Sequence, residues 1–217
     1  PFCCLLNRSA MNAAAPSPPL APSERADLIT KDMVRWLERA VIGLNLCPFA
    51  KGVHAKGQIH YVVSAATGAE ALAQDLRREL ADLAAAPAEV RDTTLLMAPD
   101  CLQDFLEFND FLGLAEDVLE ELDLDGTLQI ASFHPQFQFA GTDAGDVTNC
   151  TNRAPYPTLH LLREDSIDRA VQAYPEAEAI YERNMEVLEQ LGMPGWQALD
   201  VGVSTAATTP ELPKDPA

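Results

Sequence analysis

The stretch TTLLMAP, residues 93–99, most constrains the fold, because it is a continuous apolar run with the composition of a strand. Such a strand has no polar face to turn toward water, so both faces of its sheet must be covered. Two β-rich segments, residues 58–64 and 127–133, lie on either side of it in the sequence, and helical patterns separate all three. This β-α-β-α-β order predicts a sheet packed against helices, in the α/β class.

Three segments carry apolar residues at intervals of three and four, which predicts amphipathic helices. The first runs from about residue 24 to 44, ahead of the first strand. We expect Thr67 and Glu70 to form a capping box for the second helix, and Asp100 to cap the third. The third helix has the clearest apolar stripe: Phe105, Phe108, Leu112, Ala115, Leu119 and Leu122.

Residues 134–157 show no sustained periodicity, and a loop of this length inside a compact domain is usually functional or disordered. Its aromatic residues favour order. A fourth strand, residues 158–162, and C-terminal helices follow, and we expect Pro175 to open the last of these helices and Gly192 to end it. The direction of the fourth strand is open, so the fold is α/β or α+β, and a ferredoxin-like sandwich is one option. If the first three strands are parallel, the loop begins at the edge where open α/β sheets bind ligands.

The 217 residues suffice for one domain with a sizeable core. Residues 1–22 are rich in Ala and Pro, which predicts a disordered leader. Residues 23–197 form the predicted single globular domain, and residues 198–217 a flexible C-terminal tail.

The formal net charge is −18, from 15 Lys and Arg against 33 Asp and Glu. This acidity argues against nucleic-acid partners and against docking on anionic membranes. The five cysteines form no disulfide framework, so we expect a reducing, cytoplasmic location, or an organelle if the source is eukaryotic. No Walker A, G-x-G-x-x-G, G-x-S-x-G or H-E-x-x-H motif is present, so the cofactor and any metal stay unknown.

The candidate site is centred on the long loop. We expect His134 to act as general acid/base or metal ligand, and His160 as a second base or ligand, because histidine titrates near cellular pH. Cys47 would be a pocket wall or a reactive thiol, although packing beneath Pro48 and Phe49 explains it more simply. Arg153, placed before two prolines, suits a fixed contact to a small anionic ligand or to an acidic side chain of the protein itself.

Four separated blocks resemble one family: GLNLCPFA (43–50), LEFNDFL (106–112), FHPQFQFAG (133–141) and TNRAPYPTLHLLRE (151–164). Over about residues 30–196 the chain is similar to domain-of-unknown-function family 1415, a group of mainly bacterial proteins. The resemblance implies no activity, cofactor or catalytic residue. An aromatic residue commonly stands in the family where this chain has Cys150, which counts against an essential Cys150. Three polar residues of these blocks complete the predicted ligand-binding set: Asn109, Asn152 and Tyr156.

Three functional hypotheses follow. In the first, the protein is an enzyme, or otherwise processes a small molecule in a pocket formed by the 134–157 loop. In the second, the same loop docks a ligand or partner in a non-catalytic regulatory module, and exposed Phe137 and Phe139 would favour this reading. In the third, the polar residues only stabilise the fold. The oligomeric state stays open in all three.

Overall fold

The structure is a computed structural model that describes residues 20–173 and 179–204. The predicted leader (except residues 20–22), a predicted helix start at Pro175 and the tail beyond Ser204 lie outside these ranges.

Four strands of the described residues form one mixed sheet in the order β1-β2-β4-β3. They are β1 (Ile59–Val63), β2 (Thr93–Met97), β3 (Leu128–Phe133) and β4 (Thr158–Arg163). β1 pairs with β2 in parallel, whereas β4 runs antiparallel to both β2 and β3. The first three strands therefore share one direction, an arrangement that the sequence left open. The element order differs from the β-α-β-β-α-β order of a ferredoxin-like sandwich, so that option is not realised.

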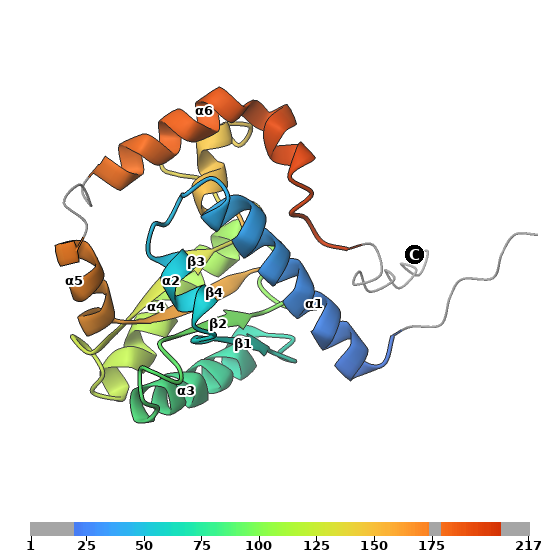
Figure 1. The fold of residues 1–217 in the computed structure, drawn as a ribbon. Coiled ribbons are helices and arrows are strands. Elements are labelled where there is room, and N and C mark those ends of the chain that lie inside the picture. Colours follow the sequence, from blue (N-terminus) through green and yellow to red (C-terminus); the bar gives the residue numbers. More distant parts are fainter. Residues whose placement is uncertain (1–19, 174–178, 205–217) are drawn as a thin grey trace, which may run out of the picture.

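One face of the sheet is covered by α3 (Ala69–Ala85) and α4 (Phe105–Glu121) (Figure 1). The leucine stripe of α3 and the aromatic stripe of α4 bury their side chains against this face. β2 contributes Leu96, and β4 contributes Leu159 and Leu161, which are likewise buried. The helical periodicity in the sequence thus identifies the real contact faces.

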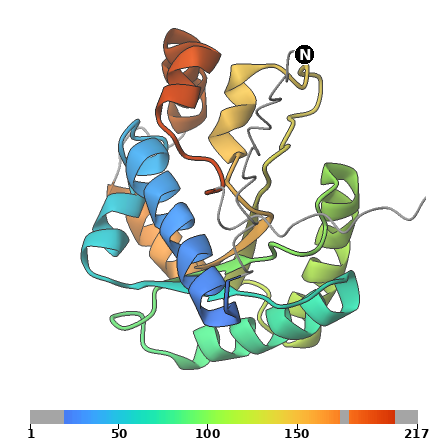
Figure 2. The same ribbon diagram turned by 90° about the vertical axis from the view of Figure 1, so that its right-hand side faces the viewer.

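The opposite face is covered by α1 (Pro22–Trp36), a π-helical turn η1 (Leu37–Ile42), α2 (Ala50–Ala55) and α5 (Glu164–Ala173). Figure 2 shows this layer on the other side of the sheet from α3 and α4. All five residues of β2 are buried, as the apolar run 93–99 requires of a strand covered on both faces. The α/β class is confirmed, as a three-layer sandwich.

A smaller cluster lies beyond the sheet, where α6 (Ile180–Ala198) packs on η2 (Val147–Asn152), a 3-10 helix within the long loop (Figures 1 and 2). Leu46, Cys150 and Leu188 form its buried centre. The long loop is therefore ordered and roofed by a helix.

Two predicted helix caps are wrong. α4 begins four residues later than predicted, because Asp104 accepts hydrogen bonds from the N–H groups of Leu106 and Glu107. Asp100 forms a bidentate ion pair with Arg25 of α1 instead. The N-cap of α3 is Gly68, with no side-chain cap, in place of the predicted capping box at Thr67.

Candidate functional site

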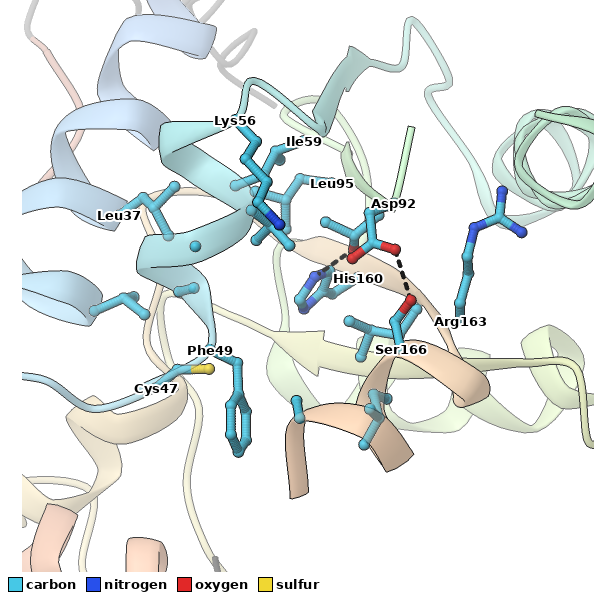
Figure 3. A pocket seen from close by; sticks show the side chains of 18 of the residues that line it. Leu37, Cys47, Phe49, Lys56, Ile59, Asp92, Leu95, His160, Arg163 and Ser166 are labelled. Carbon is cyan, nitrogen blue, oxygen red and sulfur yellow. Dashed lines mark hydrogen bonds between the residues drawn. The ribbon is translucent and has the colours of Figure 1, made fainter. Parts of the chain in front are cut away.

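A pocket of about 450 Å³ lies on the α1 side of the sheet, between α2 and α5 (Figure 3). Its wall is largely apolar, and an aromatic pair, Trp36 with Phe133 at 5.1 Å between ring centroids, forms part of it. The other apolar residues come from η1, α2, the sheet and α5: Leu37, Val41, Val53, Ile59, Leu95, Leu162, Ile167 and Ala170. Volume and lining match those of small-molecule sites.

The π-helical turn shapes this wall by placing Leu37 and Val41 toward the pocket. Single π-helical turns inside α-helices are rare and frequent at functional sites. Gly43 follows directly, and a Cβ there would lie 2.3 Å from the carbonyl oxygen of Arg39. Only glycine fits this close approach, so the sequence accommodates the turn that forms the pocket wall.

His160 of β4 provides a polar group on this wall. Its Nε2 lies 2.7 Å from Oγ1 of Thr93, and that hydroxyl donates to the carbonyl oxygen of Leu161 at 2.6 Å. Because the hydroxyl has one proton and a carbonyl can only accept, the His160 Nε2–H must donate to Thr93. In the neutral ring, Nδ1 then carries the lone pair.

Burial lowers the pKa of His160 from 6.5 to about 4. The ring is therefore neutral at cellular pH, and Nδ1 is a hydrogen-bond acceptor. None of the described residues donates a hydrogen bond to this nitrogen.

Cys47 lines the same pocket from the segment before α2. Burial raises the pKa of its thiol, against the lowering effect of hydrogen bonds from the backbone N–H groups of Phe49 and Ala50. The sulfur is thus a protonated thiol at neutral pH. Figure 3 shows it beside Phe49, on a different side of the pocket from His160.

Asp92 and Ser166 extend the polar edge next to His160 (Figure 3). The Ser166 hydroxyl donates to Oδ1 of Asp92 at 2.6 Å and accepts from the exposed Arg169 at 2.9 Å. Sequence reasoning missed these residues, together with Lys56 at the end of α2. No local pattern distinguishes them, because they meet only once α2 and α5 flank the sheet.

His134 lies apart from this pocket, fully buried against Phe105 and Phe108 of α4. Its Nε2–H donates to the carbonyl oxygen of Leu102 at 3.1 Å, and its Nδ1 accepts from the N–H of Gln136 at 3.0 Å. Both ring nitrogens are occupied. Burial lowers its pKa, so the ring holds the loop entrance as a neutral group.

Arg153 lies on a second, more open hollow of about 500 Å³ beside the long loop. Its guanidinium donates to the carbonyl oxygens of Phe137 at 3.1 Å and Ala144 at 2.7 Å, so it ties the two halves of the loop together. Phe137 is neither exposed nor fully buried, and its ring packs against Phe105 at a tilt and against Phe139 edge-to-face.

The remaining predicted ligand-binding residues lie in three different places. The Asn152 side chain donates to the carbonyl oxygen of Ser132 at 3.3 Å, close to the start of the loop. The Tyr156 hydroxyl donates to the buried carboxylate of Asp32 at 2.8 Å, an interaction within the α1 layer. Asn109 is exposed on α4. The structure thus unites His160 with Cys47 and separates both from His134 and Arg153.

Within the described ranges, no group of three or more His, Cys, Asp or Glu side chains is arranged to hold a metal ion. Over the same part of the chain, no helix is long and apolar enough to cross a bilayer.

Layers and pocket together define the class of this protein, a three-layer α/β domain with a largely apolar pocket against one sheet face. The chain belongs to a family described as a protein of unknown function, DUF1415, whose model matches residues 28–198. Comparisons with curated proteins and with solved structures find no match. The family resemblance in the sequence is confirmed, and functional assignment rests on the site itself.

Proposed function

We propose that the protein binds a small molecule in the pocket between α2 and α5. The apolar body of the ligand packs against Trp36 and Phe133, and one of its polar groups donates a hydrogen bond to Nδ1 of His160. The observation that carries this proposal is the combination of a cavity of about 450 Å³ with a polar edge on one wall. Apolar pockets with a few convergent polar groups are typical of ligand sites.

The chemistry of this edge favours recognition over proton transfer. General bases work best with a pKa near the working pH, and the pKa of His160 is about 4. A nucleophilic cysteine needs a lowered pKa or an adjacent base, whereas burial raises the pKa of Cys47. The non-catalytic hypothesis is therefore the better supported of the two functional readings.

The hollow beside the 134–157 loop supports a ligand less well. Two nitrogens of the Arg153 guanidinium already donate to loop carbonyls, and both nitrogens of His134 are in use. A bound anion would have to compete with contacts that hold the loop. We therefore centre the proposal on His160.

A neutral fluorescent probe, N-phenyl-1-naphthylamine, tests the proposal, because its emission rises on entering an apolar pocket. Ala170→Phe places a ring where α5 lines the pocket, and Val171→Phe places the same ring at an exposed neighbouring position. We expect wild type and Val171→Phe to bind the probe equally, and Ala170→Phe to bind it about tenfold or more weakly, since overpacking excludes it. Equal binding by all three folded proteins would refute the proposal.

A further inference from the structure

The polar edge of the pocket presents two hydrogen-bond acceptors that receive no hydrogen bond from the described residues. Asp92 accepts one hydrogen bond, from Ser166, on Oδ1. No described residue donates to its Oδ2, and none donates to Nδ1 of His160. Asp92 directly precedes Thr93, to which His160 is hydrogen-bonded, so the two acceptors belong to one edge (Figure 3).

The cations near this edge do not neutralise those acceptors. Arg163 lines the pocket, but its guanidinium donates to the backbone carbonyls of Leu83 and Ala86 at the end of α3 and of Arg91 before β2. Lys56, the C-cap residue of α2, also lines the pocket, and its side chain extends toward this edge in Figure 3. No ion pair of Asp92 occurs within 4.0 Å among the described residues.

We propose that the ligand is an apolar molecule bearing a protonated amine, held between Oδ2 of Asp92 and Nδ1 of His160. This inference rests on the proposed function and specifies the ligand class. An ammonium group has three N–H donors and no acceptor, which complements an edge that offers acceptors. The hydrogen bond to a carboxylate is charge-assisted, and it gains strength beside an apolar wall of low dielectric constant.

The charge of the whole chain acts in the same direction. A formal net charge of −18 raises the local concentration of cations and disfavours anions. A ligand carboxylate would face both this field and the Asp92 carboxylate, at a site where His160 is neutral. An alcohol could donate only one hydrogen bond and would leave the other acceptor unpaired.

Three compounds with one carbon skeleton provide the test: 3-phenylpropylamine, 3-phenylpropan-1-ol and 3-phenylpropanoate. Each is titrated at pH 7 against protein loaded with the neutral naphthylamine probe. From the displacement curves, we expect the amine to bind about tenfold more tightly than the alcohol, as one charge-assisted hydrogen bond allows. The acid should bind most weakly. If the alcohol or the acid equals or exceeds the amine, the inference is wrong.

Asp92→Asn retains an acceptor for Ser166 and removes the charge, so we expect the amine to lose about tenfold in affinity while the alcohol is unchanged. Asp168→Asn, on the exposed face of α5, removes the same charge without touching the pocket and should shift the amine by less than about twofold. Equal losses in both variants would overturn the contact with Asp92. If Asp92→Asn does not fold, the ranking of compounds on wild type decides.

The two proposals fail separately. Absence of probe binding to wild type refutes the pocket as a ligand site. Probe binding without a preference for the amine leaves the pocket intact and refutes only the ligand class.

Discussion

His134 and His160 lie on opposite faces of one sheet, and each is held by hydrogen bonds, yet their surroundings differ in a decisive way. His134 has a partner on both ring nitrogens and aromatic rings on its flanks. His160 has a partner on Nε2, and its ring faces a cavity. Burial lowers both pKa values, so neither the shift nor the neutral state distinguishes structure from recognition. The two rings differ at one atom, because Nδ1 of His160 receives no hydrogen bond from the described residues.

The partners of His134 tie it to the turn before α4 and to the long loop. Leu102, whose carbonyl accepts from Nε2, has a φ of 52°, in the left-handed region that a leucine adopts at a cost of about 1 kcal/mol. The ring therefore holds a strained turn before α4 and, through Gln136, the start of the long loop. We infer that the contacts on the loop side of the molecule stabilise the loop, and that a ligand binds on the α2–α5 side.

The largest expected difference between the two histidines is in stability, and it is tested by replacing each ring in turn. His134→Ala leaves the Leu102 carbonyl and the Gln136 N–H unpaired in the interior and opens a cavity beside Phe108. We expect the free energy of unfolding to fall by about 3 kcal/mol, measured by urea denaturation. His160→Ala enlarges an existing pocket, and Thr93 keeps its bond to Leu161, so a loss of about 1 kcal/mol is expected. Equal losses would show that both sites are structural.

A second prediction concerns pH. The pKa of His160 is 6.5 in the unfolded chain and about 4 in the folded one, so between these values the unfolded chain binds more protons. Stability therefore rises with pH across this window and is lost as the pH falls from 6.5 toward 4. His160→Gln should lose about 3 kcal/mol less stability than wild type over this range. Other titrating groups are common to both proteins and cancel, so parallel stability curves would contradict the assignment.

The layers of the fold follow from patterns that single segments carry. The apolar run at 93–99 and the stripe from Phe105 to Leu122 report burial directly, because strand and helix periodicities depend on local spacing. α2 was missed, since Pro48 and the short length of Ala50–Ala55 leave no helical repeat to read. Gly192 was predicted to end a helix, but its φ of 65° only kinks α6, which continues to Ala198.

The site was less predictable because it depends on which side of the sheet each residue faces. His134 and His160 both border the loop in sequence, and the antiparallel register of β3 with β4, which pairs Ala131 with His160, turns His160 toward the α2 layer. That register is set by tertiary pairing and not by local composition. Asp92 and Ser166 are likewise 74 residues apart and meet only in the folded chain.

Tyr156 offers a smaller test, because it belongs to the sequence block of the loop but points into the α1 layer. Its hydroxyl donates to the fully buried Asp32, which also accepts from Ser204 and pairs with Arg35. Tyr156→Phe removes one donor to a buried carboxylate and should lower the free energy of unfolding by about 1.5 kcal/mol. Probe affinity should stay unchanged. If Tyr156→Phe lost probe binding while its stability was unchanged, the predicted role of Tyr156 in ligand binding would be supported instead.

The smallest effect is expected at Asn109, a family-block residue on the exposed face of α4, on the same side of the sheet as His134. Asn109 lies inside a helix, and its side chain makes no hydrogen bond to another described residue. Replacing it with alanine should therefore stabilise the helix by about 0.5 kcal/mol. Thermal unfolding of Asn109→Ala should show a slightly raised Tm, with probe and amine affinities as in wild type. A loss of affinity instead would mean that a substitution on α4 affects the pocket on the other face of the sheet. The two faces of the sheet would then not have separate roles.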